Sequence, residues 1–191
     1  MVKIGIFALQ GDVAEHIKAI EASGCTPVQV RNPQDLDNLS GLVLPGGEST
    51  TFWKLSNRIG LDKKIISLSK EGFPIFGTCA GLIMMSRDIE GYPNQPTWNI
   101  MDVTVRRNAY GRQLESHVET IHAKDIGDVS VAFIRAPFIT RVGEKVEVLS
   151  CDKEGNIIFV RQGNFLGAAF HPEMTGDIKI HNFFCDIARR V

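Results

Sequence analysis

The sequence has no excess of charge of either sign and no long hydrophobic run. Its 191 residues carry 21 Lys and Arg against 22 Asp and Glu, for a formal net charge of -1 at pH 7. This balance argues against a nucleic-acid-binding surface and against an acidic tail. The apolar segment 2–9 is too short to span a bilayer, and it lacks the charged start and cleavage region of a signal peptide. We therefore expect a cytoplasmic protein with no membrane partner and no nucleic-acid partner.

Cysteine is scarce and scattered. The four cysteines are Cys25, Cys79, Cys151 and Cys185, and no two of them form a Cys-x-x-Cys pair. This spacing does not favour a zinc site, and a disulfide framework is not expected at this length without a secretion signal. We predict no metal site, and we expect three of the four thiols to be small buried side chains. Cys79 is the exception, because of its neighbours.

No internal repeat, low-complexity segment or linker divides the chain, so residues 1–191 are expected to form one domain. Strands are predicted at 2–9, 26–30, 41–44 and 73–76, with helices between them at 13–22, 50–57 and 62–70. Further strands are predicted at 103–105, 115–123, 129–134, 146–150, 157–161 and 165–170, before a closing helix at 177–190. This order predicts an α/β fold, a doubly wound, mixed but mostly parallel sheet flanked by helices in three layers, as in flavodoxin. Asp12 is placed to cap the first helix.

The segment Gly77-Thr78-Cys79-Ala80-Gly81 lies between an apolar strand and an apolar helix. A Gly-x-nucleophile-x-Gly turn forces the central side chain into a strained corner at the top of a sheet. Backbone N–H groups at the start of the following helix favour a thiolate there. The pattern predicts that Cys79 is a nucleophile, and a small buried thiol at a strand end is the alternative that the pentad alone leaves open.

The tripeptide His171-Pro172-Glu173 follows the predicted strand 165–170, and catalytic groups gather at such strand ends in open α/β sheets. His171 is suited to exchange a proton with the thiol and with a leaving amine, and Glu173 to hold the imidazole in the required tautomer. A surface turn with a solvated carboxylate is the alternative. The weaker candidates for the base are His16, His117, His122 and His181.

A glycine pair lies in Pro45-Gly46-Gly47-Glu48, directly after the predicted strand 41–44. The chain has neither the Gly-x-x-x-x-Gly-Lys of a phosphate-binding loop nor the Gly-x-Gly-x-x-Gly of a dinucleotide site at this point. Adjacent glycines let a backbone approach a ligand closely. We expect N–H groups near Gly46 and Gly47, with that of Ala80, to stabilise an oxyanion. A plain strand-to-helix turn is the alternative.

Together these three motifs resemble those of the class I glutamine amidotransferases. Five longer segments resemble the glutaminase subunits of pyridoxal 5'-phosphate synthase and run nearly from end to end of the chain: 8–16, 45–51, 107–113, 133–137 and 171–177. The chain departs from that pattern at 116–119, where Ser-His-Val-Glu stands in place of Ser-Phe-Glu and brings in His117. This departure does not touch Cys79, His171 or Glu173.

The resemblance implies hydrolysis of the side-chain amide of L-glutamine by a triad of Cys79, His171 and Glu173, with no metal and no organic cofactor. It also implies a hetero-oligomer in which the ammonia passes to a (β/α)8-barrel synthase subunit, which makes pyridoxal 5'-phosphate from ribose 5-phosphate and glyceraldehyde 3-phosphate. Arginine suits the α-carboxylate of glutamine, and a carboxylate suits its α-ammonium. The implied glutamine site consists of Gly47, Glu48, Ser49, Arg106, Ile134 and Arg135.

Two glycine-containing turns, 10–11 and 45–47, are candidates for an activation switch, because a glycine peptide reorients at little steric cost. We expect docking of the synthase to select the orientation of Gln10 and Gly11 in which an N–H faces the oxyanion. Three alternatives stay open: a stand-alone cysteine hydrolase of the same fold, a non-catalytic binding module, and the glutaminase of another synthase such as imidazole glycerol phosphate synthase. Retention of the triad residues argues against the second, and segments 8–12 and 107–113 argue against the third.

Overall fold

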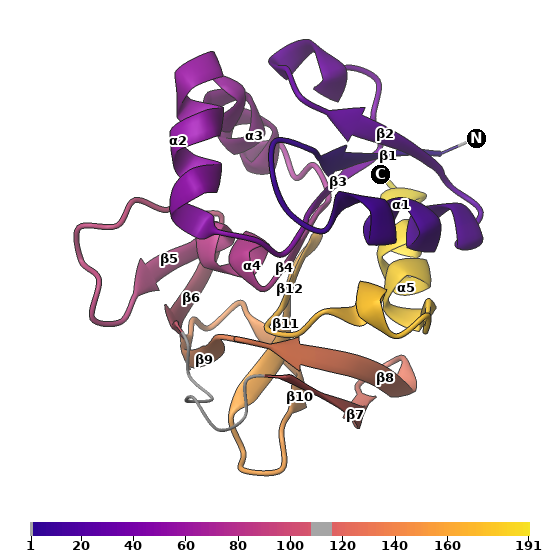
Figure 1. Ribbon diagram of the computed structural model, residues 1–191, viewed down its shortest axis with the longest axis vertical. Coiled ribbons are helices and arrows are strands. Elements are labelled where there is room, and N and C mark those ends of the chain that lie inside the picture. The colour runs from indigo at the N-terminus through magenta and orange to yellow at the C-terminus, as the bar shows by residue number, and fades with distance from the viewer. Residues whose placement is uncertain (1, 108–115) are drawn as a thin grey trace.

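The computed structural model describes residues 2–107 and 116–191, and within them a central sheet runs through the molecule (Figure 1). The first half alternates strands with helices, in the order β1 (Lys3–Phe7), α1 (Val13–Ala22), β2 (Thr26–Val30), the 3-10 helix η1 (Pro33–Leu36), β3 (Gly41–Leu44), α2 (Ser49–Ile59), α3 (Leu61–Lys70), β4 (Ile75–Thr78) and α4 (Ala80–Met85). The expected βαβ order is confirmed here, because each apolar run ends at a glycine or proline turn.

The second half consists mainly of strands. They are β5 (Ser86–Ile89), β6 (Met101–Arg106), β7 (Ser116–Ala123), β8 (Gly127–Ile134), β9 (Phe138–Val142), β10 (Glu147–Cys151), β11 (Ile157–Gln162) and β12 (Phe165–Ala168), followed by the 3-10 helix η2 (Pro172–Met174) and α5 (Lys179–Ala188). Strands β11 and β12 form the hairpin that the turn at 162–164 predicts.

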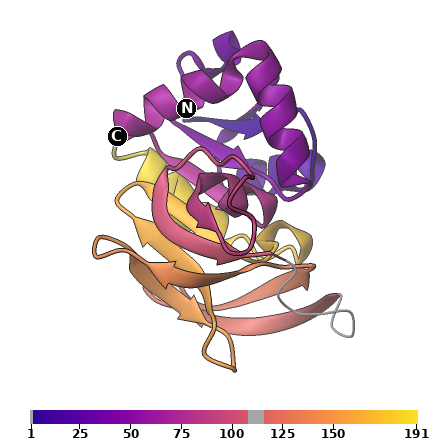
Figure 2. The ribbon, with the colours of Figure 1, turned by 90° about the vertical axis from the view of Figure 1, so that its left-hand side faces the viewer.

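The strand order across the main sheet is β2-β1-β3-β4-β12-β11-β9-β6-β5, with β10 paired to β11. Strands β2, β1, β3, β4 and β12 pair with one another in parallel. The pairs β12–β11, β11–β9 and β9–β6 are antiparallel, and the edge pair β6–β5 is parallel again. Helices α1 and α5 cover one face and α2, α3 and α4 the other (Figures 1 and 2). The predicted fold class, a mixed sheet flanked by helices, is confirmed.

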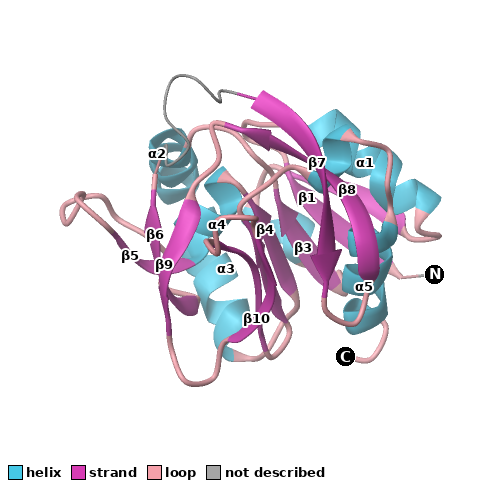
Figure 3. Cartoon of the chain, turned by 90° about the horizontal axis from the view of Figure 1, so that it is seen from below, coloured by secondary structure: helices cyan, strands magenta, loops and turns pink. Residues whose placement is uncertain are grey.

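Strands β7 and β8 form a separate antiparallel hairpin, which lies at the bottom of Figure 1 and on the side of the viewer in Figure 3. The hairpin is tied to the segment that follows β12, because the N–H of His171 donates to the carbonyl of Ala132 at 2.7 Å and the N–H of Ala132 donates back at 3.2 Å. The backbone of His171 is therefore held between the sheet and the hairpin.

The buried core is built from the apolar strands and the inward faces of the helices, and Phe7, Phe52, Phe76 and Phe184 are among its largest fully buried side chains. Cys25 and Cys185 are buried, as expected, whereas Cys151 is exposed. The expectation for Cys151 was wrong because this residue ends β10, whose one strand partner in the described part of the chain is β11. Among the described residues, no helix is long and apolar enough to cross a membrane.

Candidate active site

Cys79 occupies a sharp turn between β4 and α4. Its backbone has φ 45° and ψ -102°, a region that residues with a side chain rarely adopt, and its N–H donates to the carbonyl of Ala168 at 2.8 Å. The flanking glycines are required by space. A Cβ at Gly77 would lie 2.6 Å from the Met85 sulfur, and one at Gly81 would overlap the carbonyl of Leu44. The turn thus has the predicted shape of a nucleophile elbow.

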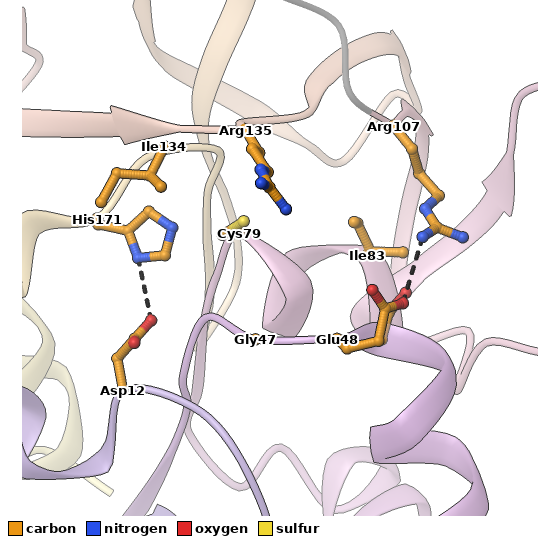
Figure 4. A pocket seen from close by; sticks show the side chains of 10 residues that line it. Asp12, Gly47, Glu48, Cys79, Ile83, Arg107, Ile134, Arg135 and His171 are labelled. Carbon is orange, nitrogen blue, oxygen red and sulfur yellow. Dashed lines mark hydrogen bonds and ion pairs between the residues drawn. The ribbon is translucent and has the colours of Figure 1, made fainter. Parts of the chain in front are cut away.

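His171 reaches the same place from the neighbouring strand. Strand β12 is parallel to β4 with Ala168 opposite Thr78, so the chain leaves both strands at one edge of the sheet. The Nδ1 atom of His171 lies 2.8 Å from Glu173 Oε1, and the Glu173 side chain is fully buried. In Figure 4 the other ring nitrogen of His171 lies on the side of Cys79. The structure therefore brings Cys79, His171 and Glu173 together in the order that the sequence predicts.

The surroundings of His171 favour its protonated form. Burial by itself lowers the pKa of His171, but hydrogen bonds with Asp12, Cys79 and Glu173 outweigh burial and raise this pKa to about 12. Burial raises the pKa of Glu173, and the hydrogen bond from His171 opposes that rise. We infer an imidazolium at His171 near neutral pH, paired on one side with the Glu173 carboxylate.

A second carboxylate, that of Asp12, approaches the imidazole. Asp12 Oδ2 lies 3.4 Å from His171 Nδ1, and the side chain makes no capping hydrogen bond to α1 (Figure 4). Asp12 therefore occupies the predicted N-cap position of α1, but its side chain does not make the capping hydrogen bond. The protonated ring nearby is the stronger partner, because both groups of that pair are charged, whereas a helix N–H is neutral. In the sequence, the signal for this role of Asp12 was that an acidic residue directly follows Gly11.

Asp12, His171 and Glu173 are also close enough to surround a metal ion, because one ligand atom of each lies within 4.8 Å of the others. The Nδ1 atom of His171, which faces both carboxylates, is already engaged by Glu173. The ion pair between the protonated ring and the carboxylates accounts for the grouping, because a metal would need that nitrogen as a bare lone pair.

A cavity of about 340 Å³ opens beside the cysteine (Figure 4). Its lining consists of Asp12, Gly47, Glu48, Ser49, Cys79, Ile83, Arg107, Ile134, Arg135 and His171. Five of the six predicted glutamine-site residues line it, and Asp12, Ile83 and Arg107 are additions that sequence reasoning missed. Arg135 points toward Cys79 in Figure 4, and its backbone has a positive φ of 46°. Strained backbone of this kind is frequent at functional sites.

Arg106 is the predicted residue that the cavity excludes. Its guanidinium binds Glu90 at 2.6 Å and lies over the ring of Phe138, and half of the side chain is exposed. Arg107 lines the cavity instead of Arg106. Its side chain is 17% exposed, contacts Glu48 at 3.3 Å and lies over the ring of Tyr92. The structure places Arg106 outside the cavity because successive residues of an extended chain point to opposite sides, and a role of Arg106 in binding glutamine stays a prediction.

Arg107 is fixed by a polar network at the entrance of the cavity. The amide oxygen of Gln95 accepts a hydrogen bond from Arg107, and the amide nitrogen of Gln95 donates to Ser49 Oγ at 2.9 Å. Glu48 Oε1 also accepts from the hydroxyl of Thr50 at 3.2 Å. Arg107 and Glu48 thus place opposite charges at one end of the cavity. The rest of the predicted motif, residues 108–113, lies outside the described residues.

The expected oxyanion region is packed against the imidazole. A Cβ at Gly46 would overlap the ring of His171, so the backbone passes as close as a glycine allows. Ala80 is the first residue of α4, directly after Cys79. The roles of Gly46, Gly47 and Ala80 as donors to an oxyanion stay predictions. His117, where the chain departs from the resembling pattern, stacks on Phe133 at 5.0 Å and is not part of the cavity lining.

The two candidate switch turns touch each other. The N–H of Glu48 donates to Gln10 Oε1 at 2.9 Å, and the N–H of Asp12 donates to the carbonyl of Gly46 at 3.3 Å. Gly11 has φ 111°, and a Cβ there would overlap the Gly46 carbonyl. A movement of one turn therefore has to move the other.

Comparison with known proteins agrees with this geometry. Residues 6–189 match the SNO glutamine amidotransferase family. The chain belongs to this family. A crystal structure of a glutamine amidotransferase shares 41% of its residues and superimposes with a TM-score of 0.93, covering 97% of this chain and 98% of the other. The structure of PurLQS from Thermotoga maritima, 14% identical with a TM-score of 0.71, covers 99% of this chain and 98% of the other and shares the fold.

Two curated relatives carry the name pyridoxal 5'-phosphate synthase subunit PdxT. The protein from Desulforudis audaxviator is 46% identical over 188 residues, which cover 97% of this chain and 98% of the relative. The protein from Geobacillus thermodenitrificans is 47% identical over 188 residues, which cover 98% of this chain and 95% of the relative. This family member is thus similar over nearly its whole length to named subunits of one synthase.

Proposed function

We propose that this chain is the glutaminase subunit of a pyridoxal 5'-phosphate synthase: it hydrolyses L-glutamine to L-glutamate and ammonia. The observation that carries the proposal is the strained Cys79 turn, which opens into a cavity beside an imidazole that Glu173 binds at 2.8 Å. A thiol in such a turn, next to a protonated imidazole, is suited to acyl transfer. The similarity to PdxT proteins over nearly the full length supports the same function.

The chemistry follows from the order of the side chains. The Cys79 thiolate attacks the carboxamide carbon of glutamine, and the imidazolium of His171 gives its proton to the departing ammonia. The neutral imidazole then accepts a proton from the water that cleaves the γ-glutamyl thioester. Glu173 keeps the ring in the orientation and tautomer that both steps need. N–H groups near Gly46, Gly47 and Ala80 stabilise the tetrahedral oxyanion in this proposal.

The charged residues of the cavity match the main-chain groups of free glutamine. Its α-carboxylate suits Arg107 and Arg135, and its α-ammonium suits Glu48. Arg107 and Glu48 contact each other at 3.3 Å in this structure. In our proposal the bound amino acid takes up these two charges, while Gly47 and Ser49 shape the wall. This accounts for a free amino acid as substrate better than for a peptide, whose α-groups are blocked.

The partner proposed for this chain is a synthase subunit with a (β/α)8 barrel, which receives the ammonia in a hetero-oligomer. The linked turns around Gly11 and Gly46 are the proposed switch, because both lie beside His171 and the cavity. Docking of the synthase selects the orientation of the Gln10–Gly11 peptide in which an N–H faces the oxyanion. Glu48, on the same turn, is open to contact with either glutamine or the partner.

The test is ammonia release at saturating glutamine, measured with and without the synthase subunit, for the wild-type chain and for Cys79→Ala. We expect release that depends on Cys79 and increases when the synthase is added. An electrophilic glutamine analogue should modify Cys79 and none of Cys25, Cys151 and Cys185, as read by peptide mass. Equal turnover with and without the synthase would favour the stand-alone hydrolase. No release in either sample would reject the glutaminase.

A further inference from the structure

A fully buried polar cluster of His16, Thr78 and His181 joins the candidate triad to helices α1 and α5. His16 Nε2 lies 3.3 Å from Thr78 Oγ1 and 3.5 Å from Glu173 Oε2. On its other side, His16 Nδ1 lies 3.0 Å from His181 Nε2. All three cluster residues have no exposed surface. Glu173 Oε2, the oxygen that does not bind His171, has no hydrogen-bond partner among the described residues, and the 3.5 Å contact with His16 is longer than a hydrogen bond of good geometry.

Both imidazoles of this cluster are neutral near pH 7. Burial, and then electrostatic repulsion by the protonated forms of His181 and His171, lower the pKa of His16 well below its usual value. Burial lowers the pKa of His181 to about 4. Each ring therefore carries one N–H and one bare nitrogen, and the placement of those protons decides what His16 offers to Glu173.

Two proton placements satisfy the contact between the rings, since one must donate and the other accept. If His16 Nδ1–H donates, His181 must carry its own proton on Nδ1, which has no partner among the described residues. A bare His16 Nε2 would then face the carboxylate of Glu173. If His181 Nε2–H donates, neither of these two rings has an unpaired N–H, because His16 Nε2–H then bonds to Thr78 and lies 3.5 Å from Glu173. The second placement is favoured, because leaving a buried donor unpaired destabilises the folded state.

We propose that His16 is a positioning residue of the glutaminase: its neutral ring, oriented by His181, directs Nε2–H at Glu173 and holds that carboxylate in line with His171. The inference rests on the glutaminase function proposed above. One oxygen of Glu173 receives the N–H of His171, and the other lies next to the N–H of His16. The same His16 nitrogen contacts Thr78, which directly precedes Cys79, so one ring touches both segments that carry the triad.

The charged and titratable groups around Glu173 come from several elements. His171 lies on its own segment at 2.8 Å, and Asp12, at the start of α1, raises its pKa. His16 faces it from α1, with His181 of α5 behind. A second cavity, of about 280 Å³, also reaches Glu173, and its lining includes Glu15, Lys18 and Asp177. Of these groups, His16 brings a ring nitrogen to 3.5 Å from the free oxygen, while His171 occupies the other oxygen.

The variants are His16→Leu, which removes the donor, and His16→Gln, whose amide N–H lies close to the position of Nε2. His122→Gln is the matched control, since that side chain is 77% exposed on the β7–β8 hairpin. In complexes with the synthase subunit, we expect His16→Leu to lower kcat for glutamine about tenfold or more with little change in KM. The acid limb of the pH profile of kcat for this variant should move up by roughly one pH unit, because a Glu173 that lacks this donor protonates more readily.

His16→Gln should recover most of the rate and return the acid limb toward that of the wild type, and the control should match the wild type. A purely structural role predicts the same loss at every pH for both His16 variants, and that result would overturn the inference. So would a His16→Leu variant with the kcat and the pH profile of the wild type. If the wild-type complex itself releases no ammonia, the glutaminase proposal fails first.

A measurement on the wild-type chain keeps the inference testable even if the Leu variant does not fold. Long-range ¹H–¹⁵N NMR correlations distinguish the two neutral tautomers of each histidine. We expect His16 and His181 to show the Nε2–H tautomer and to stay neutral between pH 6 and pH 8. A proton on Nδ1 of His16, or a His16 ring that titrates in this range, would rule out the proposed donor.

Discussion

At the scale of single residues, the site depends on a backbone conformation of Cys79 that residues with a side chain disfavour. Cys79 has φ 45°, which costs a residue with a Cβ on the order of 1–3 kcal/mol. The strain persists because both ends of the peptide are held: the Cys79 N–H donates to Ala168, and the Cys79 carbonyl accepts from Ile83 at 3.1 Å. The thiol thereby faces the cavity, and the stability of the rest of the fold offsets the strain.

Two replacements of Cys79 separate its chemistry from its strain. Cys79→Ala and Cys79→Gly should both abolish ammonia release, since neither retains the nucleophile. Cys79→Gly should be more stable than Cys79→Ala by about 1 kcal/mol, because glycine adopts positive φ at little cost. Urea unfolding of the two variants gives the comparison. An alanine variant as stable as the glycine variant would show that the turn is not strained.

The adjacent arginines offer a matched pair for the glutamine site. Arg107→Ala should raise KM for glutamine about tenfold to a hundredfold, the usual effect of losing a charged hydrogen bond, with a smaller change in kcat. Arg106→Ala removes an exposed pair with Glu90, which is worth little, so its KM should stay near that of the wild type. Steady-state kinetics of the complex measure KM for both variants. A larger rise in KM for Arg106→Ala than for Arg107→Ala would place Arg106 in the glutamine site.

At the scale of elements, the sequence predicts best where an apolar run must be a buried strand. Strands β1, β3 and β4 are almost wholly buried, and their apolar residues end at turns. Strands β5 and β9 were missed because Ser-Arg-Asp-Ile and Phe-Ile-Thr-Arg-Val mix exposed and buried positions within a few residues. Such short strands are fixed by pairing with β6, a contact that is non-local in the sequence.

The residues of the candidate site also fall into those that the sequence predicts and those that it does not. The motifs around Cys79 and His171 indicate a nucleophile and a base with its carboxylate, so the triad could be proposed from the sequence. Asp12 could not, because a carboxylate before a helix has two good partners, a backbone N–H and a distant imidazolium, and the fold alone brings the second within 3.4 Å. His16 was undecided for the same reason: its partners lie 62 and 165 residues away along the chain.

The interlocked turns make Gly11 an element-scale test. Gly11→Ala adds a Cβ where the Gly46 carbonyl lies, so the turn at 45–47 must shift against His171. We expect turnover in the complex to fall at least about tenfold, since a small misplacement of catalytic groups is enough. Gly155→Ala is the control for backbone strain alone: its φ is 86°, and no atom lies within 4 Å of the new Cβ. Equal turnover in the two variants would argue against coupled turns.

At the scale of the whole molecule, the site lies where the strands and both helix layers meet. Cys79 and His171 leave the paired strands β4 and β12, and the hairpin β7–β8 holds the backbone of His171 from below. His16 and His181 then connect α1 to α5 through the ring contact at 3.0 Å. Neutral histidines in such a position link the stability of the entire fold to pH, because the unfolded chain exposes them to protonation.

The direction of that pH dependence follows from the pKa shifts. The pKa of His181 falls from 6.5 to about 4 on folding and that of His16 falls well below 6.5, so between these values the unfolded state binds more protons than the folded one. Stability should therefore drop as the pH falls from 6.5 toward 4, with a contribution from His181 on the order of 3 kcal/mol. His171 does not offset this loss, because its raised pKa gives a contribution that is complete below pH 6.5 and is lost only toward about 12.

Urea unfolding at pH 7.0 and pH 4.5 measures the effect. His181→Gln removes one of the two titrating rings and keeps an N–H near the position that faces His16. We expect it to lose less stability than the wild type between the two pH values, even if it starts lower at pH 7.0. Carboxylates that titrate in the same range contribute equally to both proteins, and the exposed His122→Gln control should follow the wild type. Parallel losses in the wild type and in His181→Gln would show that the buried ring is not held neutral by the fold.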